Sequence, residues 1–163
     1  MKFFLRLYSV FFILIIVFAI NSCKQKKKVV VPGTKQIILL VDTENIRPGN
    51  NAKDYCSFQG LSKNPPRDSI ENYTTDVLPG DSIVWIGRST SAPNEDDVSI
   101  KMIIHRGGPP VLGHQDSING KVVGIIKGDA KPKQKETYAI RFKVIKGSPP
   151  YNTYILDPKI LVH

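Results

Sequence analysis

Three kinds of side chain in this sequence could do chemistry: cysteines, histidines and a run of carboxylates. His105 and His114 are separated by eight residues rich in Gly and Pro, so a hairpin could bring both imidazoles to one metal ion. Structural metal sites usually add two more ligands at defined spacings, and the sequence lacks these spacings. Glu95, Asp96 and Asp97 are not interleaved with the Gly and Asn residues of a calcium loop. We therefore predict no metal and no cofactor, and exposed loop positions for both histidines.

Cys56 is the second candidate for chemistry. A nucleophilic thiol needs exposure and a lowered pKa, whereas most single cysteines are simply buried. The sequence contains no G-x-S-x-G motif, and its Ser, His and Asp residues have no diagnostic arrangement. We predict that the protein is not an enzyme and has no catalytic residue. An enzyme that uses Cys56 with a histidine is an open alternative.

The N-terminal segment indicates where the protein is located. Lys2 and Arg6 precede an apolar run, Leu7–Ile20, which has the length of a signal-peptide h-region. A membrane-spanning helix needs about 20 apolar residues, so this run is short for a span. An uncleaved signal anchor over residues 3–20, with Arg6 reaching the headgroups, and ordinary secretion after cleavage are the alternatives.

The end of this run carries a resemblance to a known class. Ile20, Asn21 and the small Ser22 precede Cys23. The stretch resembles the signal peptides of bacterial lipoproteins, in which a lipobox ends at the cysteine that is acylated and becomes the mature N-terminus. The resemblance implies that residues 1–22 are removed and that Cys23 anchors the chain to a membrane of the bacterial cell envelope, facing the periplasm or the surface.

The basic residues are concentrated next to that cysteine. The formal net charge is +9, but only 16 basic and 14 acidic residues lie from Gln36 onward, which leaves +2 for the rest of the chain. A nucleic-acid-binding protein needs a basic face on its folded part, so we predict no nucleic-acid partner. Basic side chains beside a membrane are attracted to anionic headgroups. The predicted membrane-proximal residues are Lys24, Lys26, Lys27 and Lys28.

The remaining sequence predicts strands. In Glu136–Ile145 apolar residues alternate with polar ones, and further β-rich runs are separated by Gly and Pro turn signals. Asn119-Gly120 suits a two-residue type I′ hairpin turn. We predict residues 23–35 as a lipidated cysteine with a basic tether. Residues 36–163 are predicted as one all-β domain, a single antiparallel Greek-key β-sandwich that follows the N-terminal signal or anchor helix.

One segment of this domain carries a second resemblance. LPGDSIVWIG, residues 78–87, resembles the turn and strand of cupredoxin-like and Ig-like β-sandwiches. Copper-binding cupredoxins also need a histidine after this strand and a late loop that supplies Cys, His and Met. His105 could be the first ligand, but no cysteine follows Cys56. The resemblance therefore implies the sandwich without the copper, and a metal-binding or electron-transfer protein is an alternative function.

Two loops are the predicted binding regions. Thr43–Asn72 has no clear periodicity, and a long irregular segment in a compact domain is commonly functional. The neighbouring loop 106–116 is the second region. We predict a membrane-tethered binding or structural module, attached through its lipid anchor, whose partner is an envelope protein or a small ligand. The candidate residues are Tyr55, Cys56, Phe58, His105, Arg106 and His114.

Overall fold

The computed structural model describes residues 31–60, 70–147 and 151–163. The predicted signal peptide, Cys23 and the four lysines that follow it lie outside the described residues. Within those residues, no helix has the length and apolar character needed to cross a membrane. Pro32–His163 forms one compact unit, and its first strand begins at Thr34, inside the segment predicted as tether.

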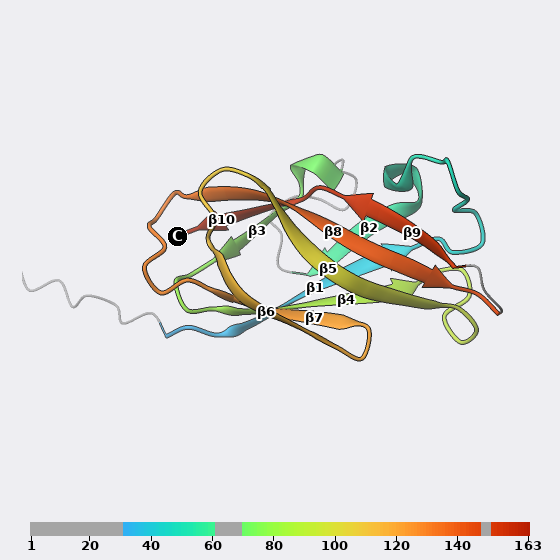
Figure 1. Cartoon of the computed structure of the whole chain (residues 1–163), viewed down its shortest axis with the longest axis horizontal. Coiled ribbons are helices and arrows are strands. Elements are labelled where there is room, and N and C mark those ends of the chain that lie inside the picture. The colour runs from blue at the N-terminus through green and yellow to red at the C-terminus, as the bar shows by residue number, and fades with distance from the viewer. Residues whose placement is uncertain (1–30, 61–69, 148–150) are drawn as a thin grey trace, which may run out of the picture. The chain divides into compact units, whose positions relative to one another are not determined.

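Strands make up most of the described chain (Figure 1). The two short 3-10 helices are η1 (Ala52–Tyr55) and η2 (Ile70–Asn72). The strands are β1 (Thr34–Val41), β2 (Cys56–Gly60), β3 (Thr74–Val77), β4 (Ser82–Ser89), β5 (Asp97–Gly107), β6 (Leu112–Ile118), β7 (Lys121–Ile126), β8 (Lys135–Ile145), β9 (Asn152–Leu156) and β10 (Lys159–Val162).

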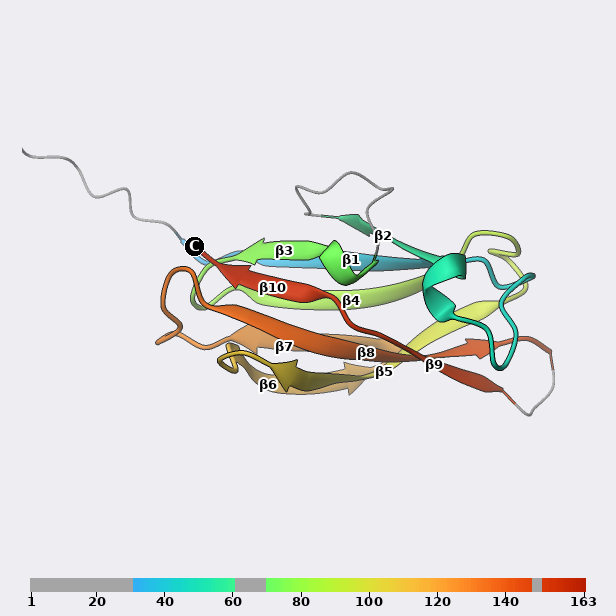
Figure 2. The same ribbon diagram turned by 90° about the horizontal axis from the view of Figure 1, so that it is seen from above.

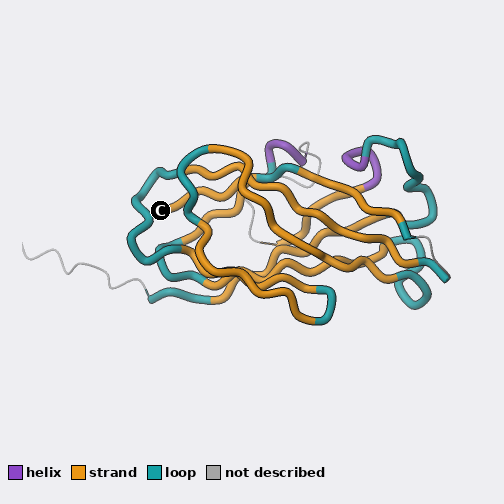
Figure 3. The backbone as a smooth tube through the Cα atoms, viewed as in Figure 1, coloured by secondary structure: helices purple, strands orange, loops and turns teal. Residues whose placement is uncertain are grey.

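The strands form two open sheets that lie one over the other (Figure 2). The first sheet has the order β2-β1-β4-β7-β6. The second has the order β3-β10-β8-β5, and β9 also pairs with β8. The strands run along the length of the molecule, and the loops gather at its two ends (Figure 3).

Both sheets are mixed, so the prediction of a purely antiparallel domain is wrong. β1 runs parallel to β4, and β10 runs parallel to β3. After β1 the chain forms β2 on one side of it and then visits the second sheet in β3. It returns as β4 on the other side of β1, in the same direction as β1. Alternation in the sequence reports which face of a strand is buried, and it carries no information about the direction of the neighbouring strand.

The core lies between the two sheets and confirms the predicted alternation. Tyr138, Ile140, Phe142 and Val144 of β8 are all buried. Trp85 of β4 is fully buried and meets Tyr138 of the opposite sheet edge to face, with ring centroids 5.8 Å apart. The Trp85 indole Nε1 donates to the Tyr138 hydroxyl over 3.2 Å. This pair joins the two layers at the centre of the core.

The turns agree with the sequence patterns. Asn119 and Gly120 both have positive φ, 49° and 75°, as a type I′ turn between β6 and β7 requires. At Asp157-Pro158 the chain passes from β9 to β10, and both strands pair with β8. The proline therefore separates the two strands that pair with this side of β8, because it cannot donate to the ladder.

β2 corrects one part of the sequence analysis. Cys56–Gly60 was predicted within an irregular binding loop, but it pairs antiparallel with β1. Phe58 is its one large apolar residue that faces the core, opposite Leu39. A strand this short shows too little alternation to be read from sequence.

Candidate ligand-binding site

The two predicted binding loops lie at opposite ends of β8. Gly107, at the start of the 106–116 loop, pairs with Thr137 near the first residue of β8. Ile46 and Arg47, from the loop after β1, line a hollow together with Val144 and Lys146 at the other end. The structure therefore does not bring the two loops together, and each end is described by itself.

At the end near Lys135, one buried carboxylate has hydrogen-bond partners on both of its oxygens. Glu136 is 1% exposed. Its Oε2 accepts from the backbone N–H groups of Val111 and Leu112 over 2.6 and 2.9 Å. Its Oε1 lies 2.9 Å from Nδ1 of His105. These contacts fasten the 107–112 loop to β8, so His105 has a structural partner here. We refer to this region as the closed end.

The other two candidate residues of this loop each lie beside a carboxylate at the surface. Nε of Arg106 lies 3.4 Å from Oδ1 of Asp157, and both side chains are nearly half exposed. Exposed His114 lies 3.1 Å from Asp116 on the same strand. The prediction placed both histidines in exposed loops, whereas both belong to strands, His105 in β5 and His114 in β6. Among the described residues, no three His, Cys, Asp or Glu side chains form a group that could hold a metal ion.

Packing, burial and backbone hydrogen bonds describe the positions of three further candidates, Tyr55, Cys56 and Phe58. Phe58 is buried and packs on Tyr73 with centroids 4.3 Å apart. The Tyr55 carbonyl accepts from the N–H of Asp42 over 2.8 Å. Burial raises the pKa of the Cys56 thiol to about 12, so the thiol stays protonated near neutral pH. A protonated, partly buried thiol is a poor nucleophile.

The end of β8 near Lys146 has two adjoining hollows, and we refer to it as the open end. The first hollow has a volume of about 190 Å³. It lies between the loop after β1, the end of β8 and the start of β9. Its lining residues are Ile46, Arg47, Val144, Lys146, Tyr151, Asn152 and Tyr154.

The second hollow has a volume of about 420 Å³ and follows β9. Its walls are residues 48–52 and Asn152–Ile155. The residues of this lining are uncharged, and Asn50, Asn51 and Thr153 give it amide and hydroxyl groups. Asn152 and Tyr154 belong to both linings, so the two hollows adjoin each other along β9.

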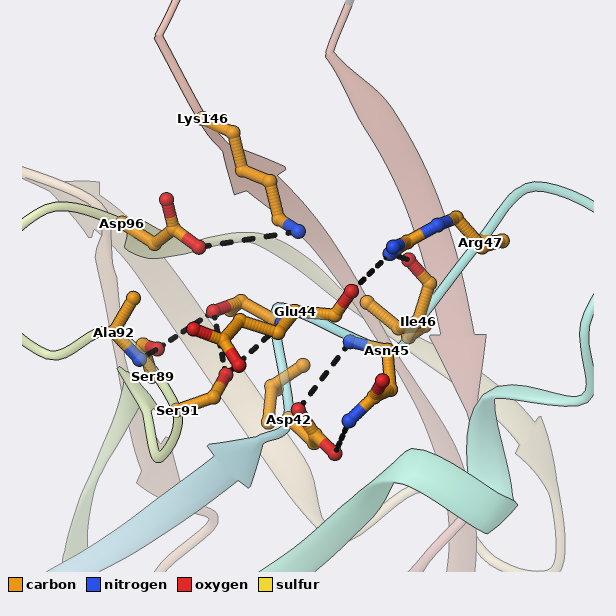
Figure 4. A network of polar contacts seen from close by, with 12 residues as sticks. Asp42, Glu44, Asn45, Ile46, Arg47, Ser89, Ser91, Ala92, Asp96 and Lys146 are labelled. Atoms are coloured by element: carbon orange, nitrogen blue, oxygen red, sulfur yellow. Dashed lines mark hydrogen bonds and ion pairs between the residues drawn. The ribbon is translucent and has the colours of Figure 1, made fainter.

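A network of short polar contacts holds the loop after β1 in place (Figure 4). The hydroxyls of Thr43 and Ser89 are 2.7 Å apart and buried. The backbone N–H of Glu44 donates to Oγ of Ser91 over 2.9 Å. The Asn45 amide donates to Asp42 over 2.7 Å. The loop that carries Arg47 is therefore held in place by side chains at the end of β1 and at the end of β4.

Two cations from opposite walls line the first hollow. In Figure 4 the side chains of Arg47 and Lys146 point toward each other. Nη1 of Arg47 donates to the carbonyls of Glu44 and Ile46, the latter over 3.0 Å. Nζ of Lys146 lies 4.0 Å from Asp96, at the limit of an ion pair. Among its described lining residues the hollow has no carboxylate, so its charge is positive.

The aromatic residues of the hollow come from β9 and the residue before it. Tyr154 is 6% exposed and stacks on Phe142 with centroids 5.4 Å apart. Its buried hydroxyl has no hydrogen-bond partner within the described residues. Burial raises the pKa of this hydroxyl, and the positive charge of Arg47 and the nearby Asn152 side chain act in the opposite direction. Nζ of Lys143 lies 4.6 Å from the ring centroid of Tyr151. A buried polar group without a partner is uncommon in folded proteins.

The sequence analysis included one wall of this site and missed the other. Arg47 belongs to the predicted segment 43–72, but it was not among the candidate residues. Lys146, Tyr151, Asn152 and Tyr154 lie in IKGSPPYNTY, which was interpreted only as a turn and a strand. The available signal was the pair of tyrosines directly after a Pro-rich turn, next to Lys146.

Comparisons with known proteins bear on the fold. No protein-family model matches the chain, and no curated protein matches it. Among solved structures, the fold is similar to that of the inclusion body protein PixA from Burkholderia cenocepacia J2315, with a TM-score of 0.63. The sequences are 15% identical, and the match covers 84% of this chain and 99% of that chain. At this identity the likeness shows the fold alone, which is a mostly β domain with two mixed sheets.

Proposed function

We propose that this protein is a bacterial cell-envelope lipoprotein whose two-sheet domain is a ligand-binding module. The lipid would be attached to Cys23, and the basic residues after it would lie at the membrane surface. The short apolar run that ends in Ile20-Asn21-Ser22-Cys23 supports the anchor. The open end of β8 supports the binding role.

The observation that carries the binding role is the unpartnered Tyr154 hydroxyl beside two cations. A buried hydroxyl without a hydrogen bond costs about 1–3 kcal/mol, and a ligand that accepts from it removes that cost. Clefts that combine aromatic side chains with a few convergent polar groups are the usual form of a small-molecule site. At the closed end Glu136 has partners on both oxygens. The other buried side-chain atoms without a hydrogen-bond partner among the described residues, on Tyr73, Thr75 and Asp157, line neither hollow.

The fold of the domain is similar to an inclusion body protein, but the inclusion-body role does not follow from a likeness of 15% identity. A Greek-key arrangement of the two sheets and a kinship with cupredoxin-like sandwiches belong to the same proposal. They are supported by the G-D turn, in which Asp81 is buried and accepts from the N–H of Leu78 over 2.8 Å. Nothing in the binding proposal requires a metal.

The anchor is tested by the change Cys23→Ala. We expect it to abolish metabolic labelling with palmitate and to leave a precursor 22 residues longer than the mature chain, because residues 1–22 stay attached. Labelling and mass spectrometry of the protein made in a bacterial host give the result. Cys56→Ala is the matched control and should keep both labelling and processing. A labelled Cys23→Ala protein would exclude lipidation at this residue.

The binding role is tested separately, with small molecules of several classes. The full chain in detergent is screened by saturation-transfer NMR against benzoate, benzylamine, glucose and methyl phosphate. We expect at least one of them to bind, and Tyr154→Phe, which removes only the hydroxyl and keeps the buried ring, to weaken the signal. If no compound of any class gives a signal at the open end, the hollows are not a ligand site.

A further inference from the structure

We propose that the open end binds an acidic saccharide, with the carboxylate of a uronic acid in the first hollow and a neutral sugar in the second. This inference rests on the proposed function as a binding module. It adds the class of the ligand and its orientation. The argument depends on the charge of the first hollow, on the donors that remain free there, and on the uncharged lining of the second.

The first hollow is suited to one carboxylate. A guanidinium has five N–H donors in a planar fork that matches a carboxylate. Only Nη1 of Arg47 has an acceptor among the described residues, so donors on Nε and Nη2 remain for a ligand. Lys146 supplies a second positive charge from the facing wall, and its contact with Asp96 at 4.0 Å is loose. Charge-assisted hydrogen bonds to carboxylates are about twice as strong as neutral ones.

The Tyr154 hydroxyl gives a third donor. It is buried, it makes no hydrogen bond of good geometry within the described residues, and both the charge of Arg47 and the Asn152 side chain act on it. A ligand oxygen at this position would accept from the hydroxyl and satisfy it. The three donors come from three different segments, so they would surround one anionic group and not simply line a surface.

The rest of the lining favours a polyhydroxylated ligand over a purely apolar acid. Tyr151 gives the hollow an aromatic ring, whose apolar faces can contact the C–H groups of a sugar. Asn152 can both donate and accept through its amide. The volume of about 190 Å³ is below the range for drug-sized ligands, about 300–1,000 Å³, and suits a single small unit.

The lining of the second hollow indicates which sugar unit is linked to the uronic acid. It shares Asn152 and Tyr154 with the first, so a ligand can continue from one to the other. Its amide and hydroxyl groups match neutral sugar hydroxyls, and among its described lining residues it holds no charge. A second acidic unit would find no cation there. The site is therefore expected to prefer an acidic unit linked to a neutral one.

The test compares two disaccharides that differ in one unit. The full chain in detergent is titrated by isothermal calorimetry with glucuronic acid linked to N-acetylglucosamine, and with the neutral N-acetylglucosamine disaccharide. We expect the acidic disaccharide to bind about tenfold more tightly or better, the effect of one lost charge-assisted contact. The preference should weaken as salt is added, because the two cations are partly exposed to solvent.

Three variants locate the effect. Arg47→Gln and Lys146→Gln should each weaken binding of the acidic disaccharide about tenfold and leave binding of the neutral one nearly unchanged. Lys121→Gln, an exposed lysine on β7 of the other sheet, is the matched control and should change neither. The thermal midpoints of Lys146→Gln and Lys121→Gln should equal that of the parent, which separates lost contacts from lost folding. Arg47→Gln also loses its contacts with the carbonyls of Glu44 and Ile46, and it should still unfold in one cooperative transition.

Several results would overturn the inference. These are equal affinity for the two disaccharides, a preference that survives both Arg47→Gln and Lys146→Gln, and no binding of the acidic disaccharide at millimolar concentration. In each case, a compound of the four-member NMR panel that still binds at Tyr154 would keep the binding module and exclude only the acidic saccharide. If neither the NMR screen nor the calorimetric titration detects binding, the domain is not a binding module.

Discussion

The two ends of β8 differ in the hydrogen-bond partners of a buried polar group. Each end holds a buried polar group: Glu136 near the start of the strand and Tyr154 opposite its far half. At the closed end, the carboxylate has partners on both of its oxygens and fastens a loop. At the open end, the hydroxyl has no partner within the described residues, and Tyr154 lines a hollow with two cations.

This difference shows how to separate structural polar groups from functional ones. The sequence analysis included His105 and His114 among its candidate binding residues. In the fold, His105 is occupied by Glu136 and His114 pairs with Asp116 at the surface. A residue type alone does not make a site. The state of its hydrogen bonds after folding decides whether a group remains free for a ligand.

The largest expected effect on stability comes from the core between the two sheets. Trp85 is fully buried and contacts Tyr138 across the core. We expect Trp85→Ala to lower the free energy of unfolding by about 3–5 kcal/mol, the usual range for a large buried aromatic. Urea denaturation followed by far-ultraviolet circular dichroism measures this value. A loss below about 1 kcal/mol would mean that the ring does not fill the core.

The next effect tests the closed end. Glu136→Ala removes the acceptor of two buried N–H groups, at Val111 and Leu112. Each unsatisfied donor costs about 1–3 kcal/mol, so we expect a loss of about 3 kcal/mol in the free energy of unfolding. Urea denaturation provides the value. The matched control is Glu44→Ala, an exposed glutamate at the open end, which should change stability by less than about 0.5 kcal/mol. Equal effects of the two changes would remove the contrast between the ends.

Much of the fold could be predicted from local pattern. Alternation in β8 gave the buried face correctly, and the Asn119-Gly120 pair gave the hairpin turn. Both features depend on a few adjacent residues. The parallel pairs β1·β4 and β3·β10 could not be predicted, because they depend on where the chain returns after visiting the other sheet.

The site was harder to predict for the same reason. Arg47 and Lys146 are far apart in sequence, and neither residue is unusual in its own segment. They line one hollow because the loop after β1 and the end of β8 belong to facing sheets. The missing partner of Tyr154 is invisible in the sequence, since a tyrosine in a strand normally finds one. Only packing in three dimensions reveals the group that is left free.

The smallest expected effect is also the most direct comparison of two hydroxyls. Tyr138→Phe removes the acceptor of the Trp85 indole N–H over 3.2 Å and leaves that donor buried without a partner. We expect a loss of about 1–2 kcal/mol in the free energy of unfolding. Tyr154→Phe removes a hydroxyl that has no partner within the described residues, so the same measurement should change by less than about 0.5 kcal/mol or show a gain.

The two substitutions are chemically identical, so each is the control of the other. Both replace a buried tyrosine with a phenylalanine of nearly the same volume, which keeps the packing terms equal. The difference in unfolding free energy therefore reports the hydrogen-bonding state of each hydroxyl. If Tyr154→Phe is as destabilising as Tyr138→Phe, the Tyr154 hydroxyl has a partner in the folded protein. It would then not be held free for a ligand, and the open end would resemble the closed end.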